Sequence, residues 1–212
     1  MTDSSNEWKQ LTEIKAELAE RDWFMGTSGN LSLKRSIGSE FLITASGKDK
    51  RKQTSEDFLL VNAAGMAVEN TQLRPSAEAL LHVAVYQKTS ARCVLHVHTV
   101  ENNVISELYA EQGEITFQNH ELIKATGRWE EDARLTVPII QNFSHIPTLA
   151  AEFSKYVTDD FGAVLIRNHG ITVWGRDGLE AKRILEACEF LFQYQLLLNQ
   201  QRALIVSTIT NV

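Results

Sequence analysis

Arg92-Cys93-Val94-Leu95-His96-Val97-His98-Thr99 is the stretch from which the fold can be worked out. Its apolar, β-branched run from Arg92 to Val97 predicts a buried strand that ends in two histidines. Because side chains alternate between the two faces of a strand, His96 and His98 point the same way. Two imidazoles on one face are two-thirds of a three-histidine site for a divalent metal such as zinc. The alternative is a pair of histidines that only form hydrogen bonds near a strand end.

The composition is that of an ordinary globular protein. The chain has 212 residues, 43% hydrophobic and 23% charged, and this length suits one domain over residues 1–212 better than two. The net charge of −6 argues against a nucleic-acid partner, because such domains usually carry a basic stripe. No apolar run reaches the roughly 18 residues of a membrane span, so we expect no membrane partner either.

The N-terminus and the cysteines indicate the compartment. The start, Met-Thr-Asp-Ser-Ser-Asn-Glu-Trp, lacks the basic residues and apolar core of a signal peptide. Cys93 and Cys188 stand in apolar contexts, and two cysteines make no disulfide framework. We therefore expect buried, reduced thiols in a cytoplasmic protein.

Outside the histidine strand, short strands and helices are interspersed. Hydrophobic spacing predicts helices over residues 8–18, 75–85, 100–110, 147–157 and 179–204, and strands over 31–34, 40–44, 58–61, 66–68, 115–117, 136–140, 163–167 and 171–174. Residues 54–57 resemble a capping box for a further short helix, and residues 120–125 a helix or turn. Several links between strands are too short for a helical crossover, so a mixed sheet covered by helices fits better than an all-parallel one.

Pro75 and Ser76 predict the start of the second of these helices. Glu78 would then lie in its first turn. Apolar spacing predicts that Ala77, Leu80, Leu81, Ala84 and Val85 form its buried face.

His169 is the candidate for a third metal ligand. It follows a second buried-strand pattern, Ala163-Val164-Leu165-Ile166-Arg167, and Gly170 behind it permits a tight turn. A histidine that is merely hydrogen-bonded in this turn is the alternative. His82 falls within a helical pattern and is expected to be structural, whereas His120 and His145 are expected to be surface histidines in loops.

Three segments have residues suited to anion binding, and we call them the phosphate-binding loops: Gly26-Thr27-Ser28-Gly29-Asn30, Ser46-Gly47, and Ser76. Taken alone, the first of them fits a plain turn better. Loops rich in glycine and hydroxyl groups can aim backbone N–H groups at an anion. The basic run Lys48-Asp49-Lys50-Arg51-Lys52 is either a solvated loop or a device that steers an anionic substrate inward. Together these segments favour a phosphorylated substrate.

Two glutamates are candidates for general acid/base catalysis. Glu78 lies two residues after Ser76, and Glu121 lies in Gln118-Asn119-His120-Glu121-Leu122, after a short predicted strand. Burial and the charge of a metal would set the pKa of either carboxyl group. The residues themselves do not decide between the two.

Five ordered motifs then resemble the class II aldolase/adducin family over nearly the whole chain. They are Gly26-Thr27-Ser28-Gly29-Asn30-Leu31-Ser32, Thr44-Ala45-Ser46-Gly47, Pro75-Ser76-Ala77-Glu78, His96-Val97-His98 and Asn168-His169-Gly170. The resemblance implies a three-layer α/β/α fold with a mixed, largely antiparallel central sheet. It also implies a homotetramer with active sites at the subunit interfaces.

The same resemblance assigns expected roles to individual residues. His96, His98 and His169 match zinc ligands, with one Zn²⁺ per subunit. Gly29, Asn30, Ser46, Gly47 and Ser76 match the phosphate-binding residues of sugar-phosphate aldolases, and Ser28 and Lys50 are added as candidates from the adjacent loops. Ala77 departs from the pattern, because those aldolases can carry a second serine there. Glu78 matches their catalytic glutamate, whereas Glu121 matches the acid/base of related dehydratases and is favoured here.

Within the family, three segments resemble a dehydratase branch most: Glu20-Arg21-Asp22-Trp23-Phe24, residues 44–52, and His120-Glu121-Leu122-Ile123-Lys124. The implied reaction is dehydration of a methylthio-substituted 2-ketose 1-phosphate to a 2,3-diketone, in methionine salvage. An aldolase or a 4-epimerase of the same family would instead break the C3–C4 bond of a sugar phosphate. A non-enzymatic, adducin-like scaffold is disfavoured, because this chain has all three histidines.

Overall fold

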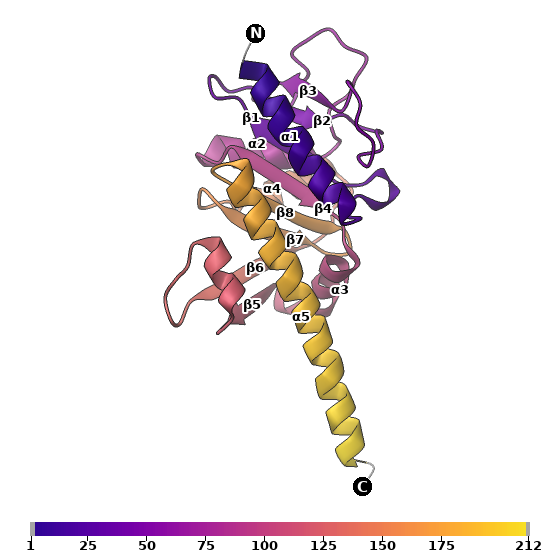
Figure 1. Ribbon diagram of the computed structural model, residues 1–212, viewed down its shortest axis with the longest axis vertical. Helices are drawn as coiled ribbons and strands as arrows, with labels where there is room; N and C mark the ends of the chain where they lie inside the picture. The colour runs from indigo at the N-terminus through magenta and orange to yellow at the C-terminus, as the bar shows by residue number, and fades with distance from the viewer. Residues whose placement is uncertain (1–2, 211–212) are drawn as a thin grey trace.

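The strand that carries His96 lies at the centre of the protein, whose computed structural model describes residues 3–210 (Figure 1). This strand, β4 (Cys93–Val97), is buried along its whole length. It pairs antiparallel with β1 (Asn30–Lys34) on one side and with β8 (Gly170–Gly175) on the other. The apolar run therefore forms a strand, as predicted, and this strand lies in the interior of the sheet.

The sheet has eight strands in the order β3-β2-β1-β4-β8-β7-β6-β5. The other strands are β2 (Phe41–Thr44), β3 (Phe58–Val61), β5 (Glu114–Gln118), β6 (Arg134–Ile140) and β7 (Gly162–Ile166). The β6–β7 pair is parallel and the other pairs are antiparallel. The expectation of a mixed, largely antiparallel sheet is confirmed.

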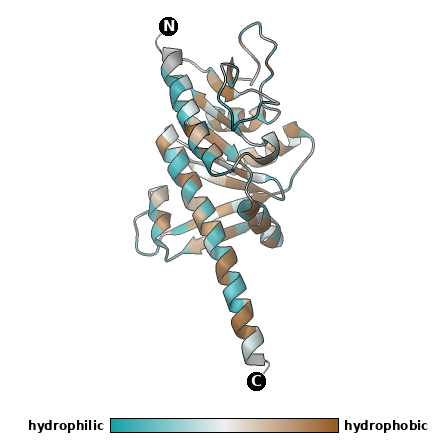
Figure 2. Cartoon of the chain, turned by 45° about the vertical axis from the view of Figure 1, so that its right-hand side comes forward, coloured by the Kyte–Doolittle hydropathy of each residue, from teal (hydrophilic) through white to brown (hydrophobic). Residues whose placement is uncertain are grey.

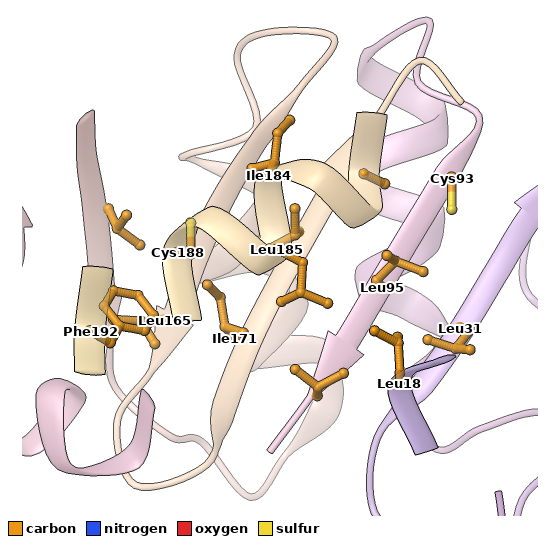
Figure 3. Packing of buried hydrophobic residues seen from close by; sticks show 14 of the residues in the cluster. Leu18, Leu31, Cys93, Leu95, Leu165, Ile171, Ile184, Leu185, Cys188 and Phe192 are labelled. Atoms are coloured by element: carbon orange, nitrogen blue, oxygen red, sulfur yellow. The ribbon is translucent and has the colours of Figure 1, made fainter. Parts of the chain in front are cut away.

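Helices cover both faces of this sheet. One face packs against α1 (Asp3–Glu20), α3 (Val100–Leu108) and α5 (Gly178–Thr210), and the other against α2 (Ala79–Lys88) and α4 (Ile146–Ser154). Because successive strand residues point to opposite faces, Leu95 lies in the first core and Val94 in the second. Figure 3 shows part of the first core, in which Leu18 and Leu31 lie side by side and Leu185 belongs to the same cluster. These are the three expected layers.

The start of α2 differs from the prediction. Residues 75–78 are not helical, because this segment is tied to the end of β2: Ala45 forms an antiparallel bridge with Pro75, and Ser46 N donates to Arg74 O at 2.8 Å. The helix begins at Ala79, so Glu78 lies at the N-cap and not in the first turn. Ala77 is exposed, which corrects its place in the predicted buried face. Leu81 and Val85 are buried as predicted.

The helix predicted at residues 54–57 is also wrong. The Asp57 carboxylate accepts hydrogen bonds from Thr54 N and Thr54 Oγ1 and pairs with the buried Lys15 ammonium group. These local bonds resemble helix capping, but β3 begins at Phe58 and leaves no residues for a helical turn.

The closing helix α5 is longer than predicted and continues to Thr210. Its C-terminal part projects beyond the rest of the protein (Figure 1), and apolar and polar residues alternate along it (Figure 2). Its first half carries Cys188 into the core, where burial raises the pKa of that thiol, and burial raises the pKa of the Cys93 thiol as well. Both cysteines are free and buried, as expected. Over residues 3–210, no helix combines the length and apolarity needed to cross a membrane.

Candidate active site

The predicted metal ligands meet at the end of β4. His96 Nε2 lies 2.8 Å from His98 Nε2 and 3.4 Å from His169 Nε2, and one ligand atom of each histidine lies within 4.8 Å of the others. His169 reaches this point because β7 and β8 are joined by a tight turn, in which Ile166 pairs with Gly170. A Cβ at Gly170 would lie 2.4 Å from Val97 O and 2.6 Å from His98 Cδ2. Only glycine therefore fits behind His169.

The surroundings prepare these imidazoles for metal binding. His96 Nδ1 lies 3.0 Å from both Ile171 O and Thr172 Oγ1. Because a carbonyl oxygen only accepts, Nδ1 donates the proton and Nε2 keeps its lone pair for a ligand bond. Burial lowers the pKa of His96 to about 4 and that of His98 to about 3. The Nε2 atoms of His96, His98 and His169 converge as the donor set of a three-histidine zinc site does, so these residues fit a divalent metal.

Glu78 completes this cluster. Its Oε1 lies 2.8 Å from His169 Nε2 and its Oε2 lies 3.3 Å from His96 Nε2. Burial alone would raise the pKa of Glu78, but attraction to His96 and a hydrogen bond from His169 hold that pKa well below its usual range. An ionised carboxylate at this position can act as a further metal ligand or carry a proton.

A buried hydrogen-bond network behind Glu78 was not anticipated. Asn30 Nδ2 donates to Glu78 Oε2 at 2.7 Å, and Asn30 Oδ1 is bonded to His82 Nε2. His82 Nδ1 lies 2.6 Å from Ser32 Oγ, which lies 2.6 Å from Tyr86 OH. Burial lowers the pKa of His82 to about 3, so this histidine is neutral. It is structural, as expected, and it also fixes the orientation of the Asn30 amide.

The sequence contained a signal for this network. His82 and Tyr86 are four residues apart, which places both on one face of a helix, and Asn30 and Ser32 are two residues apart on one face of a strand. Nothing in the sequence pairs these two faces with each other, however.

The predicted phosphate ligands line one cavity of about 220 Å³ beside the histidines. They are Ser28, Gly29, Asn30, Ser46, Gly47, Lys50 and Ser76, and His98, His169 and Glu78 line the same cavity. Gly29 has φ +75°, and a Cβ there would lie 2.8 Å from His96 O, so this loop approaches the histidine strand more closely than another residue would permit. Ser28 Oγ is buried and has no hydrogen-bond partner among the described residues.

Lys50 is the residue of the basic run that faces this cavity. It is buried, whereas Arg51 and Lys52 are exposed. Its ammonium group donates to Thr27 O at 2.8 Å, and burial, followed by the charge of Lys15, lowers its pKa. One cation of the run thus lies at the predicted phosphate site, while the exposed ones remain available for steering.

A second buried network holds α3 beside the histidines. Thr99 caps α3 by accepting from Asn102 N at 2.9 Å. The Glu189 carboxylate on α5 accepts from Thr99 Oγ1 at 2.7 Å and from Asn102 Nδ2 at 2.8 Å. Burial raises the pKa of Glu189 to about 7. Asn103 Nδ2 donates to His169 O at 3.0 Å, which ties this helix directly to a predicted metal ligand.

Glu121 does not line the cavity at the histidines. It starts the short 3₁₀ helix η3 (Glu121–Thr126), its side chain is 77% exposed, and it pairs with Lys124 at 2.8 Å. The cavity that it lines shares no residue with the cavity at the histidines. Within one chain, the structure brings Glu78 to the cluster and does not bring Glu121. His120 caps η3, and exposed His145 contacts Thr148; neither belongs to the cluster, as expected.

Comparisons with known proteins agree with this geometry. The family model of the Class II Aldolase and Adducin N-terminal domain matches residues 9–196. The methylthioribulose-1-phosphate dehydratase of Geobacillus sp. (strain WCH70) is 66% identical over 201 residues, covering 93% of this chain and 94% of that protein. The protein of the same name from Bacillus subtilis (strain 168) is 61% identical over 200 residues, covering 92% and 95%.

A solved structure supports the fold independently of these sequences. The l-fuculose-1-phosphate aldolase from Thermus thermophilus superposes with a TM-score of 0.75, covering 94% of this chain and 98% of that one. The two sequences are only 23% identical, so the comparison concerns the arrangement of helices and strands.

Proposed function

Because the chain belongs to the class II aldolase and adducin family, we propose that it catalyses the reaction for which its relatives are named. That reaction is the dehydration of 5-methylthioribulose 1-phosphate to 2,3-diketo-5-methylthiopentyl 1-phosphate, a lyase step of methionine salvage. One observation carries the proposal: His98, His169 and Glu78 line the cavity that the phosphate-binding loops also line, and the buried His96 meets them there.

The three histidines would hold one zinc ion per chain. When bound, zinc supplies a Lewis acid that stabilises negative charge on the oxygen atoms of the sugar. His96 and His98 hold the metal in this proposal and move no protons. The hydrogen bond that His96 Nδ1 donates to Ile171 O on β8 keeps its ring in the orientation that this role needs.

The phosphate-binding loops would orient the substrate. Ser28, Ser46 and Ser76 provide hydroxyl groups, Gly29 and Gly47 permit backbone N–H groups to face the phosphate, and Lys50 provides a positive charge. The phosphate is remote from the bonds that change. Its binding energy therefore serves to hold C3 against the catalytic base.

Glu121 would remove the C3 proton and return a proton to the C4 hydroxyl group, which leaves as water. The resulting enol tautomerises to the 2,3-diketone. Because Glu121 lies outside the cavity of its own chain, it would come from a neighbouring copy in a homotetramer. We place this assembly in the cytoplasm. Glu78 would then act as a metal ligand or as a second proton carrier.

The position of Glu78 favours one alternative, a sugar-phosphate aldolase. Glu78 matches the catalytic glutamate of those aldolases, and it is the carboxylate that lies beside His169 at 2.8 Å. An aldolase would break the C3–C4 bond, and a 4-epimerase would break this bond and form it again.

The reaction products distinguish these activities. We would incubate zinc-loaded protein with 5-methylthioribulose 1-phosphate and record both diketone absorbance and fragment release. A dehydratase yields the diketone without fragments. Cleavage between C3 and C4 would release dihydroxyacetone phosphate and methylthioacetaldehyde, and this result would replace the proposal by the aldolase alternative.

A further inference from the structure

We propose that a second cavity, on the other side of His98 from the phosphate-binding loops, binds the methylthio end of the substrate. Its apolar wall consists of Trp23, Met25, Val100 and Val104. This inference rests on the proposed function and adds the part of the site that determines specificity.

The two cavities adjoin at His98. The second cavity measures about 730 Å³, and His98 is the one described residue that lines both. A substrate whose phosphate lies in the first cavity and whose C2 and C3 oxygens lie at the histidines must place its remaining carbons beyond them. His98 marks where the second cavity meets the first, so C5 and its substituent would extend past this residue.

The wall of the second cavity has exposed apolar side chains. Val100 and Val104 are one turn apart on α3 and are 75% and 39% exposed, and Met25 is 58% exposed. A methylthio group removes such surfaces from water at no polar cost, and sulfur also makes favourable contacts with aromatic rings and thioethers. Both cavities also have polar walls, which in the second include Arg21, Asp22, Arg51 and Glu101. The apolar side chains of the first cavity, however, are the smaller set Ala45, Ala77 and Ile146. The second cavity therefore suits the apolar end better.

Backbone contacts attach this apolar wall to the proposed metal site. His98 N donates to Trp23 O at 3.3 Å, and Phe24 forms a parallel bridge with His98. Thr99, next to His98, caps the helix that carries Val100 and Val104. The apolar wall and the metal ligand are thus held at a constant separation, which is what a specificity pocket requires.

Binding of a matched pair of unreactive ligands tests the inference. The pair consists of the C2 alcohols obtained by reducing 5-methylthioribulose 1-phosphate and ribulose 1-phosphate, which differ only at C5. By calorimetry, we expect the protein to bind the methylthio alcohol roughly 10-fold more tightly, in the range of selectivity that one small apolar group provides in a pocket. The double variant Val100→Thr/Val104→Thr keeps the side-chain shapes and should lose most of this preference, while its affinity for the other alcohol stays the same.

Val68→Thr is the matched control, because Val68 is 45% exposed and lies on the hairpin after β3, away from the cavity. It should keep the preference. The inference would be overturned by a wild-type protein without preference, by a double variant that retains it, or by an Ile146→Thr variant that alone abolishes it. Loss of the proposed function has a different signature: no turnover of 5-methylthioribulose 1-phosphate, whatever the ratio of affinities.

Discussion

At the scale of single residues, the metal ligands make the most direct prediction. His96→Ala should lower the zinc content of purified protein from about one ion per chain to near zero, because two imidazoles and a carboxylate bind zinc much more weakly than the full set. Elemental analysis measures this content. His145→Ala is the control, since His145 is exposed and its ring Nδ1 lies 2.8 Å from Thr148 Oγ1, outside the histidine cluster. An unchanged zinc content in His96→Ala would remove the histidine cluster from the proposal.

The kinetic constants of variants distinguish the roles of Glu121 and Glu78. Glu121→Gln should lower kcat by about 10²- to 10⁴-fold with little change in KM, because it removes a proton-transfer group and no substrate contact. Its fold should be unaffected, since Glu121 is exposed. Glu131→Gln, a change of the same kind in the same outer cavity, should behave like wild type. A Glu121→Gln enzyme with undiminished kcat would assign the proton transfer to Glu78.

Buried histidines should make the metal-free protein sensitive to acid. Burial lowers the pKa of His82 and His98 to about 3 and that of His96 to about 4, whereas the unfolded chain titrates near 6.5. Below pH 6.5 the unfolded state binds protons that the folded state does not, so stability falls as pH falls. Glu189 acts oppositely, because its pKa is raised from 4.5 to about 7.

Three histidines lower the stability as pH falls, and one glutamate raises it. At about 1.4 kcal/mol per pH unit for each group, the free energy of unfolding should fall by about 3 kcal/mol per unit between pH 6.5 and 4.5. Urea unfolding at several pH values measures this slope in chelator-treated protein. Glu189→Gln should steepen the decline, and a stability independent of pH in this window would contradict the burial argument.

At the scale of elements, the turn between β7 and β8 is the part of the site most sensitive to substitution. Gly170→Ala should lose zinc affinity, because the added Cβ would meet Val97 O and the His98 ring. Gly127→Ala is an informative comparison. Gly127 has φ +80° with nothing within 4 Å of a Cβ, so this change should cost about 1 kcal/mol of stability and leave zinc affinity unchanged. Calorimetric zinc titration of both variants would test the difference.

Elements also show where prediction from sequence succeeds and where it fails. Strands β4, β7 and β8 were predictable because each is a buried run with a strong β pattern, and the histidines at their ends could therefore be placed. The start of α2 was not predictable, because a proline at position 75 is typical of a helix start and the sequence does not show its bridge to Ala45. Glu78 joins the cluster through that same long-range contact. Local patterns hold no information about such pairings, nor about the position of Glu121 relative to another chain.

At the scale of the whole molecule, the proposed delivery of Glu121 by a neighbouring copy can be tested by mixing inactive chains. His96→Ala would lack the proposed metal site and Glu121→Gln the proposed base, so each alone should have little activity. In oligomers formed from equal amounts of both, about a quarter of the sites should combine intact histidines with an intact Glu121 from the neighbour. Activity recovered after joint refolding would support a shared site. No recovery, despite mixed oligomers seen by mass spectrometry, would contradict it.

The order of strands in the sheet has a consequence for biosynthesis. β1, β4 and β8 are neighbours in the sheet but span the chain from Asn30 to Gly175, and such contacts of large sequence separation form slowly. A nascent chain that ends before His169 presents only two of the three imidazoles. If the three histidines hold zinc as proposed, high-affinity metal binding should occur at the last stage of synthesis, after β8 has left the ribosome and paired with β4. Zinc supplied during translation should therefore raise the yield of active enzyme by binding to completed chains. It should not change the folding of incomplete chains.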